Sequence, residues 1–331
     1  MKEQPANLKR NALAEAVAGG DRRALAQAIT LVESTRPEDR PAADALLEKL
    51  LPRTGKSIRI GISGAPGVGK STFIQAFGLH VLEQGHRLAV LAVDPSSRIG
   101  GGSILGDKTR MADLATDQRA FIRPSPAGIT LGGVARRSRE ALLLCEAAGH
   151  DVVLVETVGV GQSETAVADM TDMFVLLLQP GGGDELQGIK RGIVELADLL
   201  LVNKADGEML EAAGRTAAEY QHALRLLRPA TSGWQPEVMR CSALTEAGIP
   251  EAWQKVEAFR KAVGKKAIAE RRARQARAWL KAELADSLME ALARHPDLAK
   301  QLPALEAKVA AGSATPGAAA RAILGGFLGR K

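Results

Sequence analysis

The segment from Gly64 to Ser71 has the spacing G-x-x-x-x-G-K-[ST], the pattern of a phosphate-binding loop. A β-branched run, Ile58 to Ile62, precedes it and an amphipathic stretch follows, so the context is strand, tight turn and helix. Lys70 would bridge the β- and γ-phosphates, and the Ser71 hydroxyl would ligate Mg²⁺. A glycine-rich turn that binds nothing is the alternative, and the agreement of pattern and context disfavours it. The predicted phosphate contacts are Gly64, Ala65, Pro66, Gly67, Val68, Gly69, Lys70, Ser71 and Thr72.

A second motif, N-K-x-D, follows the apolar run that ends at Val202. Asp206 could accept two hydrogen bonds from the N1–H and amine of guanine, an edge that adenine does not present. The stem of Lys204 would lie over the ring, while Asn203 would brace the loop. Helix N-capping is the alternative role for Asp206. A later segment, Ser242-Ala243-Leu244, is predicted to contact the guanine oxygen through its backbone, so the expected ligand is GTP or GDP.

Three acids stand where a metal ion would be expected. Asp94 and Glu156 each follow a predicted strand, and ligands bind at the carboxyl ends of strands in open α/β sheets. Asp94 would hold Mg²⁺ through water or orient the attacking water. Glu156 opens an E-x-x-G motif in place of the usual D-x-x-G, and its carboxylate would hold the metal. Asp107, in the glycine-rich stretch 98–110, either reaches the metal when that loop closes or is a solvent-exposed acid.

Two further segments have the composition of switch loops. Gln162 lies three positions after Gly159, whereas the water-orienting glutamine of Ras-like enzymes directly follows that glycine, so its catalytic role stays open. The segment 179–190 combines three consecutive glycines with Asp184, Glu185 and Lys190. It is predicted to be a flexible switch, and an ordinary strand-to-helix connector is the alternative.

The elements that must position these residues alternate between strand and helix. Residues 1–55 have helix-period apolar positions and are predicted to form a helical N-terminal extension. Residues 56–264 are predicted to form a mostly parallel α/β sheet covered on both faces, and residues 265–331 a helical region. The predicted strands are Ile58–Ile62, Leu88–Val93, Ala120–Ile122, Val152–Val155, Met173–Leu178, Leu199–Val202 and Val238–Cys241.

Composition restricts the class of protein further. Hydrophobic residues make up 46% of the 331 residues, which allows a substantial core. A net charge of +6 with only 3% aromatic residues gives a nucleic-acid-binding surface little to build on. No apolar run is long enough to span a membrane, and no signal peptide is evident, so a soluble cytoplasmic protein is expected. The basic stretch 260–277 is predicted to be a solvated helix face rather than a lipid-binding surface.

The motifs together closely resemble those of the G3E GTPases of the MeaB/ArgK type. The resemblance rests on G-A-P-G-V-G-K-S-T from Gly64, V-D-P-S-S from Val93, E-T-V-G-V-G-Q-S-E from Glu156 and N-K-A-D from Asn203. It covers about residues 50 to 260 and implies a SIMIBI-class P-loop GTPase with helical ends. It also implies a homodimer formed through the C-terminal helices. The implied role is to gate adenosylcobalamin loading of methylmalonyl-CoA mutase and to protect that enzyme, with segment 179–190 as a partner-coupled switch.

Two other functions of P-loop proteins fit this sequence less well. A nickel-insertion GTPase would need a histidine-rich or Cys/His metal site, but the five histidines are scattered and the two cysteines form no C-x-x-C or C-H pair. A transport-linked kinase, a label attached to ArgK-like sequences, would need a phosphoryl-acceptor site that no motif here resembles. The N-K-x-D motif also favours guanine. Both alternatives are therefore disfavoured against the GTPase that acts on a cobalamin enzyme.

Overall fold

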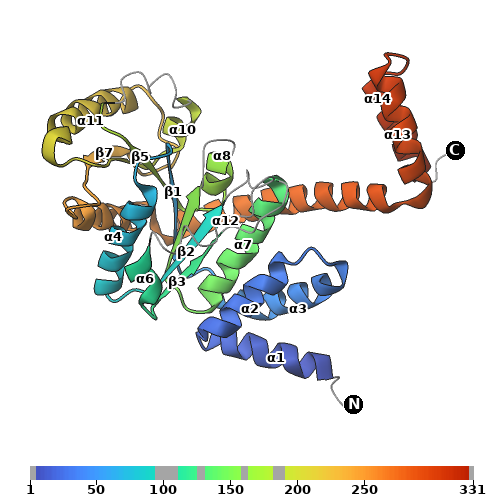
Figure 1. The fold of residues 1–331 in the computed structure, drawn as a ribbon, viewed down its shortest axis with the longest axis horizontal. Coiled ribbons are helices and arrows are strands. Elements are labelled where there is room, and N and C mark those ends of the chain that lie inside the picture. Colours follow the sequence, from blue (N-terminus) through green and yellow to red (C-terminus); the bar gives the residue numbers. More distant parts are fainter. Residues whose placement is uncertain (1–4, 94–110, 125–130, 158–162, 182–190, 328–331) are drawn as a thin grey trace. The chain divides into compact units, whose positions relative to one another are not determined.

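The structure is a computed structural model that describes residues 5–93, 111–124, 131–157, 163–181 and 191–327 (Figure 1). Within these ranges the chain divides into two compact units, residues 1–275 and 276–331. None of the helices in the described ranges is long and apolar enough to cross a membrane.

Seven parallel strands form the sheet of the first unit, in the order β3-β2-β4-β1-β5-β6-β7. All seven lie where the apolar runs predicted them, with ends that differ by at most two residues. The prediction of a parallel α/β sheet is therefore confirmed. Their bounds are β1 (Ile58–Gly64), β2 (Leu88–Val93), β3 (Ala120–Arg123), β4 (Val152–Thr157), β5 (Met173–Leu178), β6 (Leu199–Val202) and β7 (Glu237–Arg240).

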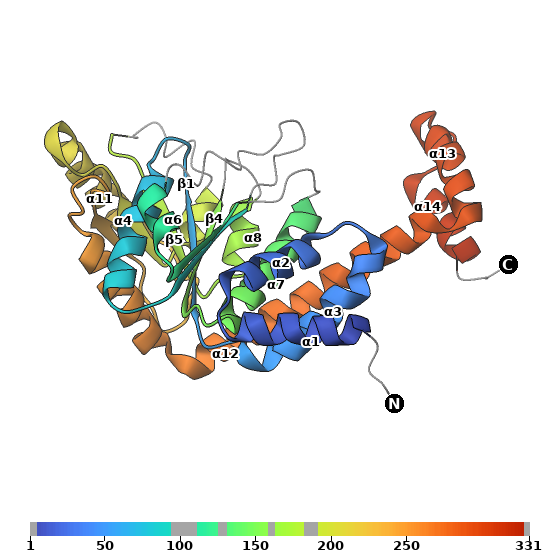
Figure 2. The ribbon, with the colours of Figure 1, turned by 60° about the horizontal axis from the view of Figure 1, so that its bottom comes forward.

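Helices cover both faces of this sheet (Figure 2). Successive residues of β1 face opposite sides: Ile60 and Ile62 belong to the core that includes α4, while a Cβ on Gly61 would meet Val167 of α8. Apart from the first part of α12 (Ile249–Arg294), the described helices of the first unit are α1 (Pro5–Ala18), α2 (Arg22–Glu33), η1 (Pro37–Asp39), α3 (Arg40–Leu50), η2 (Leu51–Arg53), α4 (Lys70–Glu83), α6 (Ala112–Thr116), α7 (Leu131–Ala147), α8 (Ser163–Ala168), α10 (Arg191–Leu196), η3 (Gly207–Met209) and α11 (Leu210–Leu224).

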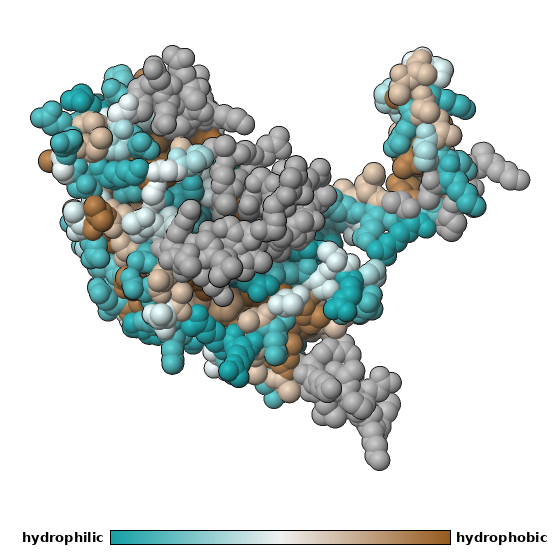
Figure 3. All heavy atoms as spheres, viewed as in Figure 1, coloured by the Kyte–Doolittle hydropathy of each residue, from teal (hydrophilic) through white to brown (hydrophobic). Residues whose placement is uncertain are grey.

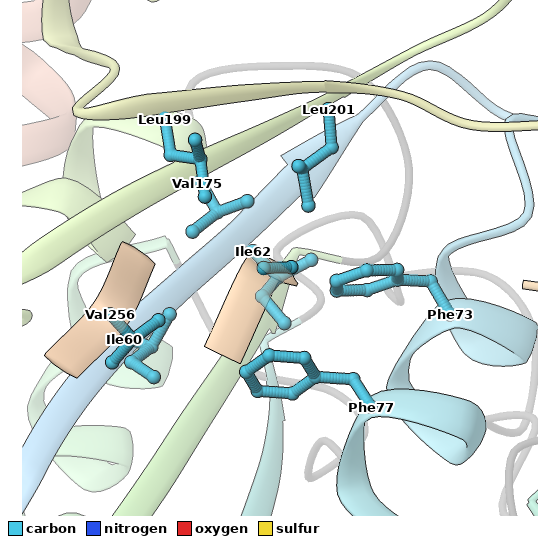
Figure 4. A pocket seen from close by; sticks show the side chains of 9 residues that line it. Ile60, Ile62, Phe73, Phe77, Val175, Leu199, Leu201 and Val256 are labelled. Carbon is cyan, nitrogen blue, oxygen red and sulfur yellow. The ribbon is translucent and has the colours of Figure 1, made fainter. Parts of the chain in front are cut away.

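The core beneath the phosphate loop is densely packed. Phe73 and Phe77 of α4 stack with ring centroids 5.4 Å apart, and Phe77 meets Trp253 of α12 (Ile249–Arg294) edge-on at 5.9 Å. Figure 4 shows Phe73 and Phe77 pointing toward β1 over an apolar void of about 10 Å³, the space of one water at most. α4 is therefore held firmly against the sheet that carries the loop.

A buried ionic network lies where β1 begins. Arg59 donates to both carboxylate oxygens of Glu146 at 2.9 Å, and Arg272 of α12 pairs with Asp172 and lies 3.8 Å from Glu146. The Arg272 guanidinium also donates to the Ser57 carbonyl oxygen at 2.7 Å. Burial alone would raise the pKa of Glu146, but the Arg59 guanidinium holds it below its usual value. Through Arg272, this network joins the part of α12 that belongs to the first unit to the start of the central strand, β1.

The described residues of the second unit form helices and the turns between them. The unit comprises the end of α12, α13 (Pro296–Ala310) and α14 (Pro316–Phe327), with the rings of His295 and Phe327 6.1 Å apart. Leu298 is buried there, but many apolar side chains of this unit are exposed, and Figure 3 shows apolar atoms at its surface. The exposed large apolar residues of this unit are Leu280, Leu284, Leu288, Met289, Leu302 and Leu324.

Candidate nucleotide-binding site

The phosphate loop runs from the end of β1 to Lys70, the first residue of α4. Gly69 has φ +92, and a Cβ there would lie 2.7 Å from the Asn203 side-chain nitrogen, so only glycine fits. The Lys70 ammonium donates to the carbonyl oxygens of Gly64 at 2.7 Å and Ala65 at 3.2 Å. The loop backbone and its lysine thus form one hydrogen-bonded unit at the N-terminus of α4, where anions bind.

Two acids influence the charge of that lysine. Burial lowers the pKa of Lys70, and the negative charges of Glu156 and Glu164 oppose this shift. Glu156 lies on β4 opposite Ile62 of β1 and is only 4% exposed, while Glu164, on α8, is 6% exposed. The structure thus adds Glu164 to the acidic groups of the site. The only sequence signal for it was its place at the end of the E-T-V-G-V-G-Q-S-E motif.

The N-K-x-D segment contacts the phosphate loop directly. Asn203 Nδ2 donates to the Val68 carbonyl oxygen at 2.9 Å, and Lys204 Nζ donates to that of Gly67 at 2.7 Å. Asn203 is buried, and Lys204 has φ +58, a left-handed conformation that is uncommon outside glycine. The prediction was that Asn203 braces the loop, and in the structure its side chain donates to the phosphate loop.

Asp206 is fixed by the second base segment. The Ser242 hydroxyl donates to Asp206 Oδ2 and accepts a hydrogen bond from the Thr245 N–H at 3.1 Å. Although Asp206 precedes η3, its side chain makes no capping hydrogen bond to that helix within the described residues, contrary to the capping alternative. Ala243 N–H donates to Asn203 Oδ1 at 3.1 Å, which ties the two base segments together. Leu244, the third residue of the second base segment, is 80% exposed.

Two of the four predicted Mg²⁺ ligands, Ser71 and Glu156, lie within the described residues. Ser71 lies in the first turn of α4, and Glu156 is buried beside Lys70, so a hydroxyl and a carboxylate lie at the phosphate loop. These hard oxygen donors fit Mg²⁺, which also keeps waters and phosphate oxygens as ligands. In the described ranges no group of three or more His, Cys, Asp or Glu side chains could hold a metal by itself. Asp94, Asp107, Gln162, Asp184, Glu185 and Lys190 lie outside the described residues.

A parallel sheet whose central strand leads into a phosphate loop, joined to an N-K-x-D base segment, defines a P-loop NTPase of the GTPase class. The chain belongs to the MeaB family, because the family model described as "Methylmalonyl Co-A mutase-associated GTPase MeaB" matches residues 25–297. The resemblance inferred from the motifs is thereby confirmed.

Named relatives agree with this assignment. The chain is 50% identical over 322 residues to the Mus musculus "Methylmalonic aciduria type A homolog, mitochondrial", covering 94% of this chain and 78% of that protein. It is 48% identical over 279 residues to "GTPase ArgK" of Escherichia coli K12, covering 84% of each. A solved structure titled "LAO/AO transport system kinase" matches with a TM-score of 0.77 and 36% identity, over 99% of this chain and 100% of that one.

Proposed function

We propose that the protein binds GTP with Mg²⁺, hydrolyses it to GDP and phosphate, and uses this cycle to gate the loading of adenosylcobalamin onto methylmalonyl-CoA mutase and to protect that enzyme. The family description, which names a mutase-associated GTPase, supports the choice of partner. The observation that carries the nucleotide part is the pair of hydrogen bonds from Asn203 and Lys204 to the phosphate loop. These bonds hold the N-K-x-D segment against the phosphate loop, which supports a single site for a guanine nucleotide.

In this proposal each group of the site has one task. Asp206, oriented by Ser242, accepts the guanine N1–H and amine hydrogen bonds. Lys70 exchanges the carbonyl oxygens of Gly64 and Ala65 for the β- and γ-phosphates. Ser71 and Glu156, with Asp94 and Asp107, would hold Mg²⁺, which offsets charge on the phosphates when bound. Gln162 is a candidate for orienting the attacking water.

The coupling to the mutase is assigned to the segment 179–190, with Asp184, Glu185 and Lys190 as its charged residues. Its glycines permit two loop conformations of similar energy, and the charged groups would select between them by pairing within the chain or with the partner. These residues lie outside the described ranges, so the assignment rests on composition and on the family.

The proposal includes a homodimer formed through residues 265–331. The exposed leucines of the second unit, among them Leu280, Leu284 and Leu288, support it, because a contiguous exposed apolar surface marks an interaction site. A second copy of the chain would cover these side chains. No nucleic acid or membrane takes part in this scheme, and the proposed compartment is the cytoplasm.

A paired assay tests this function. The GTPase rate is measured with and without purified methylmalonyl-CoA mutase, and mutase loading with adenosylcobalamin is measured with GTP and with GDP. We expect stimulated hydrolysis and nucleotide-dependent loading, with the γ-phosphate recovered as inorganic phosphate. Phosphate transferred to protein would instead indicate a kinase. Selective capture of hydrogenase or urease maturation proteins from lysate, without a cobalamin enzyme, would overturn the choice of partner.

Two variants then distinguish basal GTP hydrolysis from its stimulation by the mutase. Asp184→Ala and Lys190→Ala should keep basal hydrolysis within a few fold of the parent protein while abolishing stimulation by the mutase. Lys70→Ala serves as the control that loses basal hydrolysis. If both loop variants lose basal activity as severely as this control, the segment belongs to the active site. If both retain full stimulation, it is a connector.

A further inference from the structure

A cleft of about 700 Å³ lies between α2 and β3, outside the nucleotide site. It is lined by residues from three segments, 20–26, 116–118 and 121–124, and Figure 1 shows α2 close to the β3 edge of the sheet. This volume falls in the range of ligand and peptide sites rather than of packing defects. Nothing in the proposed GTPase cycle uses this cleft.

The cleft is positively charged. Arg22, Arg23 and Arg123 line it, and none of its lining residues is acidic. Arg123 pairs with Glu33, but Arg22 donates to the carbonyl oxygens of Ala115 and Asp117, which are neutral acceptors, and Arg23 is exposed. The charge of Arg22 acts in part on the nearby Asp117 carboxylate, which pairs with Arg119, whereas the exposed Arg23 can reach a ligand in the cleft.

A fourth guanidinium lies directly behind the cleft. A Cβ on Gly20 would lie 3.1 Å from both terminal nitrogens of Arg87, so this side chain is packed against a residue of the cleft wall. Arg87 thus places a further positive charge beside the cleft.

The opposite wall of the cleft is the edge of the sheet. β3 occupies the end position in the strand order and pairs with β2 in the sheet as described. Phe121, Ile122 and Arg123 of this strand line the cleft, and among the described residues β2 is the strand that pairs with β3. Peptide groups on an open strand edge are a template for another strand, and main-chain pairing of this kind gives affinity with little demand on sequence.

We propose that this cleft binds an extended acidic segment of a partner protein, which adds as a strand along β3 and places carboxylates on Arg22 and Arg23. Both walls of the cleft, the arginines of α2 and the strand β3, favour such a segment. The strand edge offers hydrogen bonds that a peptide backbone satisfies and a small anion does not. The guanidinium groups match carboxylates in geometry as well as in charge.

The test uses the full chain and two synthetic probes. A fluorescein-labelled eight-residue peptide of alternating valine and glutamate is titrated at 150 mM salt, with the valine–lysine peptide of the same length as its counterpart. We expect only the acidic peptide to bind, and Arg23→Glu to weaken its affinity by about tenfold or more because a charge-assisted pair becomes a repulsion. The matched control, Arg228→Glu, reverses an exposed arginine outside the cleft and should leave the affinity unchanged.

Amide hydrogen exchange provides the second readout. The acidic peptide should slow exchange at residues 120–123, whereas diffuse electrostatic binding would not. Retained GTP binding shows that Arg23→Glu is folded, and Arg23→Gln replaces it if it is not. Four results overturn the proposal: no binding of the acidic peptide, equal loss with Arg228→Glu, binding without protection of β3, or displacement by millimolar inorganic phosphate. The last result would identify a small-anion site instead.

Discussion

Asn203 Nδ2 donates to the carbonyl oxygen of Val68 at 2.9 Å, across 135 positions of sequence. The same side chain accepts a hydrogen bond from Ala243 N–H, so one buried amide connects the phosphate loop with both base segments. The conformation of the phosphate loop therefore depends on a residue that need not contact the nucleotide itself.

Replacing this amide should affect every guanine nucleotide alike. Asn203→Ala leaves Val68 O and Ala243 N–H without their partner, a loss of about 1 to 3 kcal/mol. We expect affinities for GTP and GDP to fall together, by about tenfold or more. Titration with a fluorescent GDP analogue and with a GTP analogue measures both. A variant that discriminates between the two nucleotides, or one with parental affinities, would contradict this role.

Asp206→Asn tests whether Asp206 recognises the guanine base. The variant loses a charged acceptor for guanine, so GTP binding should weaken by about 2 to 4 kcal/mol, and binding of xanthosine nucleotides should improve. Ser242→Ala is the matched control, because it removes the hydroxyl that orients Asp206 but keeps the carboxylate. It should cause a smaller loss and no gain for xanthosine. Unchanged GTP affinity in Asp206→Asn would refute the assignment.

Ser71→Ala and Glu156→Gln test the metal site. Each removes one oxygen donor or one negative charge near the γ-phosphate, so Mg²⁺-dependent hydrolysis should fall by on the order of 10²-fold or more. Hydrolysis rates over a Mg²⁺ titration measure the effect, and GDP binding without Mg²⁺ checks the fold. Near-normal turnover at limiting Mg²⁺ in both variants would show that the two residues do not serve the metal.

Truncation separates assembly from nucleotide binding. Deletion of 276–331 removes the exposed apolar helices but keeps Arg272, so we expect a monomer by light scattering that still binds GDP. Deletion of 265–331 also removes Arg272 and leaves the buried Asp172 without this partner. That second chain should be less stable by about 3 to 5 kcal/mol. An unchanged mass after the shorter deletion would count against dimerisation through this region.

Acid stability should depend on His150. Burial, aided by Arg87 and Arg22, lowers the pKa of this histidine from 6.5 to about 4, so between these values the unfolded chain binds the proton more readily than the folded chain. The contribution of His150 to the free energy of unfolding should thus be fully present above pH 6.5 and should be lost as the pH falls toward 4. At 1.36 kcal/mol per pKa unit, the loss amounts to up to about 3 kcal/mol. Denaturant titrations at several pH values measure it. His150→Gln should flatten this dependence, and the exposed His222→Gln should not.

Local sequence was sufficient for the strands and for the two nucleotide motifs. Runs such as Leu88–Val93 and Met173–Leu178 are apolar at every position because parallel strands are buried on both faces, and the structure has strands with those same bounds. The phosphate loop was predictable for a similar reason. Its glycines meet a local demand of the backbone turn, and its lysine is typical of phosphate binding, whereas the contact of Gly69 with the distant Asn203 has no signal in the local sequence.

The tertiary structure alone decided which distant residues meet. The order of the strands places β4 beside β1 and so brings Glu156 to Lys70, and the packing of α8 adds Glu164. The network of Arg59, Glu146, Arg272 and Asp172 joins residues that are at least 87 positions apart. Such pairings depend on chain topology and on desolvated charge rather than on local propensity. No periodicity along the sequence records them, because each residue of a pair is an ordinary charged side chain in its own segment.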